Sequence, residues 1–174
     1  MKFRQLYVGK ELKKAVEKRI KDLFAEYSYP PLEVIIPVLE KSGRGERELT
    51  AQVNEIDISV IKGIKEILGL KDQSMKTLAK LWEIYLGFAG VKCQPIELTE
   101  SKFVFTISDC PMLHVSKDVS LNVKSKFCDL ICTSASRAVI ETVLSPKRVN
   151  CTWDKALIKG AGKCTTGFEL VDNR

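Results

Sequence analysis

The amino-acid sequence predicts an α+β fold: an antiparallel sheet of about four strands in two hairpins, covered by helices, with an N-terminal helical extension. Three observations lead to this prediction. Apolar residues recur at steps of three and four through most of the chain before residue 92. The pattern changes to alternation over 92–98 and 102–108, and again over 148–158 and 164–171. One long helical segment separates these two pairs of strands.

The first predicted helix covers residues 10–27. Its apolar residues share one face, namely Leu12, Val16, Ile20, Leu23, Phe24 and Tyr27. Tyr29 and two prolines follow, and a proline restricts the residue before it and cannot donate to a continuing helix. Residues 32–41 then form a short helix or an extended arm.

The glycine-containing stretch 42–46 is the best candidate for a flexible linker. It divides the chain into an N-terminal helical extension, residues 1–45, and a main α+β domain, residues 46–174. Isolated amphipathic helices are marginal in water, so the stripe on residues 10–27 needs an apolar partner. We expect it to pack across a symmetric homodimer, the commonest assembly of soluble proteins.

Two more helices are predicted before the sheet. The first starts near residue 48 and is closed by Gly69; its stripe is Val53, Ile56, Val60, Ile64, Ile67 and Leu68. A second start follows at Asp72 or Ser74, and the helix over 75–89 is apolar around much of its circumference. We therefore expect that helix to be largely buried.

Turn residues divide the remaining segments. Thr99–Ser101 joins the first hairpin, and Gly160–Gly162 joins the second. Between them a helix runs from about residue 120 to Leu144 and stops before Ser145 and Pro146.

Composition and charge narrow the class of protein. The 174 residues carry a net charge of +6, but lysines and arginines alternate with glutamates along the helices, as in 11–19. This pattern is typical of a solvated surface, and no aromatic platform accompanies it, so we expect no nucleic acid as partner. The absence of a long apolar run and of a signal peptide predicts a cytoplasmic protein without a membrane contact.

Four of the six cysteines predict a metal site. Cys110 ends an alternating strand, Cys128 and Cys132 lie four apart on one helix face, and Cys164 follows the Gly160–Gly162 turn. Four thiolates favour tetrahedral zinc, and an iron–sulfur cluster is the alternative because it uses the same ligands. His114 is a reserve ligand.

Other roles for the cysteines stay open. Buried cysteine packs as a small hydrophobe, which is our interpretation of Cys93 and Cys151, and it applies equally to the Cys128–Cys132 pair. The abundance of lysine and glutamate beside a single histidine is compatible with a thermophilic source. Intracellular proteins of hyperthermophilic archaea contain disulfides, so covalent pairing is a further alternative.

Aromatic residues on the 75–89 helix predict a ligand site. Trp82 and Tyr85 combine an apolar body with a polar tip, and Phe105 comes from the facing strand. We expect a cavity between this helix and the sheet that binds a small apolar molecule oriented by one or two polar groups. The alternative is that these rings only fill the core.

Two segments resemble a known family. The closing run Lys155–Cys164 (KALIKGAGKC) followed by Phe168–Leu170, and the run Leu98–Pro111, are similar to the 4-vinyl-reductase-type, hydrocarbon-binding-like domains and to related aminothiazoline-carboxylate hydrolase-like proteins. The resemblance spans roughly residues 75–171. It implies a helix-covered sheet, an apolar pocket, a dimer, and cysteines that bind metal. Ala156 stands where the family has its first cysteine, which directs attention to the four cysteines named above.

The sequence thus predicts a small-molecule-binding domain for an apolar ligand, with a cysteine-ligated structural metal. One alternative is a cysteine-dependent enzyme, a reductase or hydrolase acting on a small organic substrate. The sole histidine and the lack of a Gly-rich nucleophile turn leave no catalytic triad to support it. A metal–sulfur regulatory or scaffold protein is the second alternative.

Overall fold

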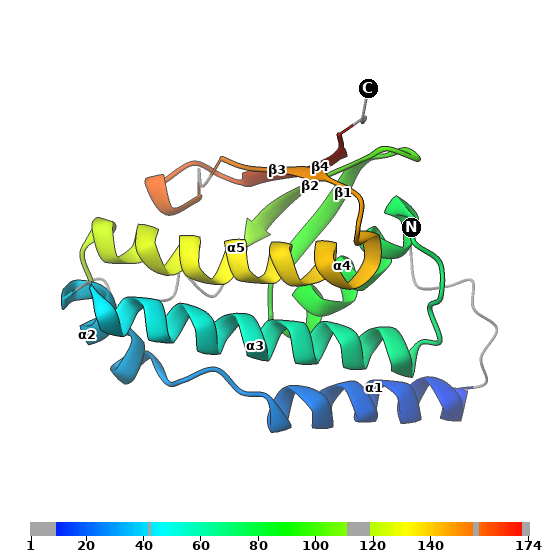
Figure 1. Ribbon diagram of the computed structural model, residues 1–174, viewed down its shortest axis with the longest axis horizontal. Helices are drawn as coiled ribbons and strands as arrows, with labels where there is room; N and C mark the ends of the chain where they lie inside the picture. Colours follow the sequence, from blue (N-terminus) through cyan, green and yellow to red (C-terminus); the bar gives the residue numbers. More distant parts are fainter. Residues whose placement is uncertain (1–9, 42, 111–118, 155–156, 172–174) are drawn as a thin grey trace.

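The predicted α+β class is confirmed by the computed structural model, which describes residues 10–41, 43–110, 119–154 and 157–171. Figure 1 shows helices on one face of a four-stranded antiparallel sheet of order β1-β2-β4-β3. The elements are α1 (Lys10–Glu26), α2 (Leu32–Lys41), α3 (Arg44–Ile67), α4 (Met75–Phe88), β1 (Lys92–Leu98), β2 (Lys102–Asp109), α5 (Leu121–Leu144), β3 (Val149–Trp153), the 3-10 helix η3 (Leu157–Lys159) and β4 (Cys164–Leu170).

The helices form layers beneath the sheet (Figure 1). Helices α4 and α5 contact the strands, and α3 packs against α5 and α4. Helix α1 packs against α3, while α2 packs against α3 and α5. The segment 32–41 is therefore a helix and not an extended arm. Helix α3 begins at Arg44, so residues 44–46 of the expected flexible linker are helical instead.

The apolar stripe of α1 is covered within the same chain. Ile20 is only 2 % exposed, and the ring of Phe24 lies 5.8 Å from that of Tyr85 on α4. Helix α3 offers Gly63 at the crossing, where a Cβ atom would come within 2.6 Å of Leu23 Cδ2. The absent side chain lets the two helices approach closely. The apolar partner that this stripe needs is therefore supplied by α3 and α4 of the same chain, while the homodimer and the division at residue 45 stay predictions.

Local signals set the boundaries of α3 and α4. After α3 the chain turns through Gly69, whose φ of 61° is left-handed, and the Leu70 N–H donates to Lys65 O at 3.1 Å. Ser74 then caps α4, since its Oγ accepts a hydrogen bond from Thr77 N–H at 3.1 Å. The second of the two predicted starts is therefore confirmed.

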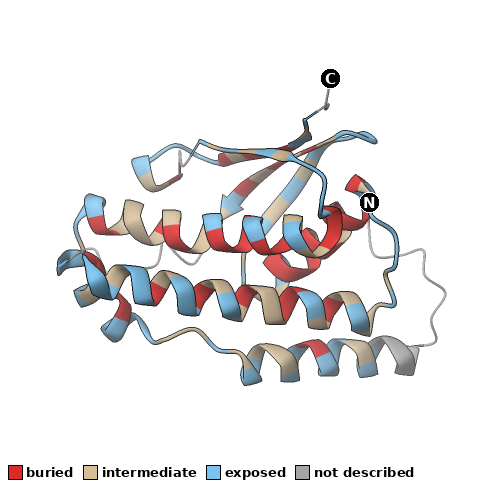
Figure 2. Cartoon of the chain, in the orientation of Figure 1, coloured by how far each residue is buried: buried red, intermediate tan, exposed pale blue. Residues whose placement is uncertain are grey.

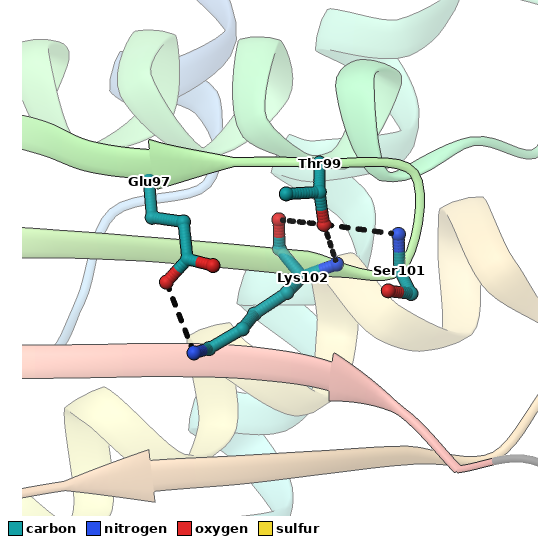
Figure 3. A network of polar contacts seen from close by, with 4 residues as sticks. All are labelled: Glu97, Thr99, Ser101 and Lys102. Atoms are coloured by element: carbon teal, nitrogen blue, oxygen red, sulfur yellow. Dashed lines mark hydrogen bonds and ion pairs between the residues drawn. The ribbon is translucent and has the colours of Figure 1, made fainter.

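The β1–β2 hairpin turns through residues 99–101 as predicted (Figure 3). Thr99 organises the turn: its N–H donates to Lys102 O at 2.8 Å, and its Oγ1 accepts from the N–H groups of Lys102 and Ser101 at 3.0 and 3.3 Å. Lys102 Nζ also pairs with Glu97 Oε2 at 2.9 Å. Backbone and side-chain bonds thus fix the register that places alternate strand residues toward the helices.

The second hairpin differs from its prediction. Strand β3 ends at Trp153 rather than near residue 158, and a short 3-10 helix follows it. Leu157 of that helix is buried, and its N–H donates to Cys164 Sγ at 3.1 Å. Burying Leu157 against the core bends the chain out of the sheet, which explains the shorter strand.

Buried residues recur along the helices and strands (Figure 2), and they form two apolar clusters. The larger one fills the space between α1, α3, α4, α5 and the sheet. The smaller one joins α2, α3 and α5 and contains Ile35, Leu39, Leu49, Val53, Val123 and Leu130. No helix in the described part of the chain is long and apolar enough to cross a membrane.

Replacing Ile20 by alanine tests the docking of α1. We expect the free energy of unfolding to fall by about 2–5 kcal/mol, because a fully buried isoleucine leaves a cavity. The loss should not depend on protein concentration, since the contact lies within one chain. Urea denaturation at several concentrations measures it. The control Val34→Ala, at a residue 51 % exposed on α2, should change stability by less than about 0.5 kcal/mol. A concentration-dependent loss would contradict the docking.

Candidate functional site

A buried carboxyl group lies at the centre of the helical layer. Asp57 on α3 is 0 % exposed. Its Oδ1 accepts hydrogen bonds from the hydroxyls of Tyr29, in the segment before α2, and Tyr85 on α4; the second bond is 2.5 Å long. The two hydroxyls also contact each other at 2.5 Å. A carboxyl in an apolar interior is costly unless it is hydrogen-bonded, so these tyrosines explain how α3 accommodates it.

Burial dominates the acid–base properties of this group. Desolvation raises the pKa of Asp57, while the nearby Ser134 hydroxyl and the hydrogen bonds from Tyr29 and Tyr85 lower it by less. Burial likewise raises the pKa of Tyr29 and of Tyr85, and the neighbouring Asp57 charge raises both further. Both tyrosines therefore remain hydrogen-bond donors at neutral pH.

The hydrogen bonding of this region is incomplete. Asp57 Oδ2 and Ser134 Oγ make no hydrogen bond with the described residues, although Ser134 lies near enough to lower the pKa of the carboxyl. The same holds for Trp82 Nε1 and Thr166 Oγ1, which are also hidden from solvent. Buried polar atoms in proteins are nearly always paired, so several unpaired ones in a single interior are unusual.

The three predicted ligand-binding residues lie together in the core. The ring of Trp82 is 5.9 Å from those of both Tyr85 and Phe105, and 5.4 Å from Phe168. Trp82 and Phe105 are 0 % exposed. The rings are in contact in this structure, so a ligand reaches this place only if they move apart. Their role as ligand contacts stays a prediction.

A surface pocket of about 560 Å³ lies elsewhere, where the end of α3 meets α5. Lys62, Lys65, Lys71, Glu66 and Glu141 are among its lining residues. Lys65 is held across it by donating to Thr142 O at 2.7 Å. Its charged lining is unlike the apolar lining of the site that the sequence predicts.

The Cys128 and Cys132 thiols meet on α5, with their Sγ atoms 3.7 Å apart. The hydrogen bond from Cys128 is the largest cause that raises the pKa of Cys132, followed by burial and then by the charges of Cys128, Cys110 and Cys164. All four cysteines of the predicted metal site are thus near enough to interact electrostatically. Cys128 is buried, whereas Cys132 is partly exposed.

This proximity falls short of a ligand set. Within the described residues, no group of three or more histidine, cysteine or acidic side chains is placed to hold a metal ion. His114 and the Lys155–Ala156 start of the closing signature lie outside those residues. The six cysteines, all described, are thiols and not disulfides. Cys93 and Cys151 pack at the edge of the larger cluster, as their interpretation as core residues predicts.

Comparison with known proteins adds a likeness of fold. No protein-family model and no curated sequence matches the chain. A crystal structure of trafficking protein particle complex subunit 3 from Naegleria fowleri, covalently bound to palmitic acid, is similar over 90 % of this chain and 97 % of that one, with 15 % identity and a TM-score of 0.57. At this identity the likeness shows a shared α+β fold.

Two H-NOX structures are more distant. An Fe(II) unliganded H-NOX protein from K. algicida covers 91 % of this chain and 96 % of that one at 10 % identity, with a TM-score of 0.41. An H-NOX protein from S. oneidensis in the Fe(II)NO state covers 93 % and 92 % at 8 % identity, with a TM-score of 0.45. These scores carry no argument about this chain.

Sequence reasoning missed Asp57, Tyr29 and Ser134. A signal for Asp57 was present, because the steps from Val53 to Asp57 to Val60 are four and three, those of the buried stripe. A carboxylate at such a position indicates a buried polar contact. Tyr29 follows the end of α1 and precedes two prolines, where no periodicity exists.

The pH dependence of stability tests the buried carboxyl. The folded-state pKa of Asp57 lies above its unfolded value of about 3.9, so the stability contributed by the protonated group is fully present below that pH. It is lost as pH rises through the folded-state pKa. Relative to Asp57→Asn, the wild type should therefore lose stability with rising pH, by about 1.4 kcal/mol per unit of elevation.

Urea denaturation between pH 3.5 and 8 measures this difference. Asp72→Asn is the matched control, because hydrogen bonds from Ser74 and Thr77 lower the pKa of exposed Asp72. The stabilising effect of the ionised Asp72 carboxylate is present above its unfolded-state pKa and is lost as pH falls. The difference in unfolding free energy between wild type and Asp72→Asn should therefore rise with pH, opposite in sign to that for Asp57→Asn. A flat or rising difference for Asp57→Asn would contradict the assignment.

Proposed function

We propose that the chain is a small-molecule-binding domain whose ligand is apolar with one polar group, held between the α4 rings and the Asp57–Ser134 region. The observation that carries this proposal is that two unpaired buried polar atoms, Asp57 Oδ2 and Trp82 Nε1, belong to residues that both contact Tyr85 in an otherwise apolar interior. A few convergent polar groups within an apolar lining are typical of small-molecule sites.

Tyr85 links the rings to the carboxyl. Its ring stacks on Trp82 at 5.9 Å, and its hydroxyl donates to Asp57. A ligand head group that donates to Asp57 Oδ2 would remove the unpaired acceptor, whose burial costs about 1–3 kcal/mol. The polar end would also accept a hydrogen bond from Trp82 Nε1, and the apolar part of the ligand would lie against the rings of Trp82 and Phe105, where burial of its surface favours binding.

The fold supports the apolar class of ligand. The trafficking protein particle complex subunit to which this chain is similar over nearly its whole length is covalently bound to palmitic acid. The resemblance of residues 75–171 to hydrocarbon-binding-like domains of the 4-vinyl-reductase type is consistent with such a ligand. We therefore propose an acyl-chain-like molecule as the occupant, within a domain of that type.

The alternative of a cysteine-dependent enzyme is less well supported. Burial raises the pKa of Cys93, Cys151 and Cys164, and the Cys128 contact together with burial raises that of Cys132. The thiolate is the nucleophile, so a raised pKa lowers reactivity at neutral pH.

We further propose that the binding domain acts in the cytoplasm as a homodimer, which sedimentation of the full chain tests.

Mass spectrometry of the purified protein tests the binding function. Native spectra should show one bound molecule, and an organic extract should yield an apolar compound near one equivalent per chain. Titration with palmitic acid and with palmityl alcohol, which share a chain, then probes the head group. Binding of neither probe, together with an empty extract, would refute the proposal.

Trp82→Phe tests the site within the core. It keeps an aromatic ring but removes the unpaired Nε1, so affinity for the bound probe should fall roughly threefold to tenfold, the effect of one hydrogen bond. Trp153→Phe is the matched control, because Trp153 Nε1 already donates to Ser136 Oγ at 3.2 Å. If Trp82→Phe leaves the affinity unchanged, or lowers it no more than Trp153→Phe does, Trp82 Nε1 makes no hydrogen bond to the ligand.

A further inference from the structure

We propose that the polar end of the bound molecule is a neutral hydroxyl, so that the site takes a long-chain alcohol in preference to a fatty acid or an alkyl amine. The inference rests on the proposed binding function and specifies the head group of its ligand. It follows from the chemical kind of the buried polar atoms around Tyr85. Asp57 Oδ2 and Trp82 Nε1 make no hydrogen bond with the described residues, and both residues are 0 % exposed.

These two atoms call for opposite hydrogen-bonding functions in the ligand. An ionised Asp57 Oδ2 accepts hydrogen bonds, whereas the indole N–H of Trp82 can only donate. A hydroxyl has one hydrogen to donate and two lone pairs with which to accept, so one small group can satisfy both kinds of atom. It also suits Asp57 in either protonation state, because it donates to an ionised oxygen and accepts from a protonated one.

Ser134 supplies a third polar group from α5. It is 3 % exposed, and its Oγ makes no hydrogen bond with the described part of the chain. Its hydroxyl lies near enough to Asp57 to lower the pKa of that carboxyl. A ligand hydroxyl that donates to Asp57 Oδ2 therefore has a second lone pair available for Ser134, and α3, α4 and α5 each contribute one group to the head-group site.

A carboxylate head group does not suit these surroundings. Burial and three neighbouring hydroxyls set the pKa of Asp57, and no lysine, arginine or histidine among the described residues contributes to it. Buried carboxylates in proteins are stabilised by such cations or by several donors at once. A carboxylate placed beside Asp57 would find no cation there, and it would be repelled whenever Asp57 is ionised.

An alkyl ammonium satisfies only part of the site. It can donate to Asp57 Oδ2, but it has no lone pair with which to accept from Trp82 Nε1, which would stay unpaired. It would also carry its charge into an interior where the Trp82 ring is surrounded by Phe105 and Phe168. Burying a charge costs more than burying a hydroxyl, so the neutral group is favoured.

Direct binding of three radiolabelled probes to the wild-type protein tests the head group and requires no variant. Palmityl alcohol, palmitic acid and palmitylamine share one chain and differ only at the polar end. At neutral pH, below the concentrations at which the probes form micelles, we expect the alcohol to bind at least tenfold more tightly than either of the others. An acid or amine that binds as tightly as the alcohol would overturn the hydroxyl assignment and leave the binding function standing. If none of the three binds, the binding function fails with it.

Asp57→Asn tests the role of the carboxyl through selectivity. It removes the negative charge and puts an amide N–H donor in place of Oδ2, so the ratio of alcohol affinity to acid affinity should fall at least tenfold. The ratio compares two probes on the same folded protein, which cancels any loss of stability in the variant. Asp72→Asn, at an exposed carboxyl, is the matched control and should keep the wild-type ratio. An unchanged ratio in Asp57→Asn, or an equal fall in Asp72→Asn, would overturn the proposal.

Discussion

The arrangement of the helices depends on the hydrogen bonds that the buried carboxyl of Asp57 accepts. Tyr29 reaches it from the segment before α2 and Tyr85 from α4, so one group joins three parts of the helical layer. It also lies where the two apolar clusters meet, because Val53 belongs to the smaller cluster and Val60 to the larger one. Removing either tyrosine would leave a buried acceptor without its donor, which costs more than the bond itself contributes. The contact therefore specifies how α3 sits between its neighbours more than it adds to stability.

This constraint bears directly on the proposed binding function. A core built only for stability would place a hydrophobic residue at position 57, because buried ionisable groups seldom add net stability. Here the carboxyl is kept, and one of its oxygens is left without a partner among the described residues. The aromatic rings beside it are apolar and fully buried, so polar and apolar recognition lie next to each other around Tyr85. That combination suits a ligand with a long apolar part and a single polar end.

The sequence predicts the fold well because each element carries its own periodicity and its own boundary residues. Ser74, Gly69 and the 99–101 turn mark ends that local chemistry alone determines. The site is harder to predict, since it depends on which helix faces meet. Ile56 and Asp57 both fit the stripe of α3, and only the packing shows that Asp57 is the buried one. The position of Cys164 beside the end of β2 depends on the β2–β4 register, which pairs Ile107 with Cys164 and cannot be read from spacing.

The cysteines show how position determines the chemistry of one residue type. Burial raises the pKa of Cys93 and Cys151 at the edge of the larger cluster, where each thiol fills space as a small hydrophobe. Cys128 and Cys132 differ in that they lie four apart on α5 and their thiols contact each other. A thiol pair at 3.7 Å is a weak hydrogen bond as it stands. The Cys128 contact is the largest cause that raises the pKa of Cys132, ahead of burial, so the arrangement favours the thiol over the thiolate.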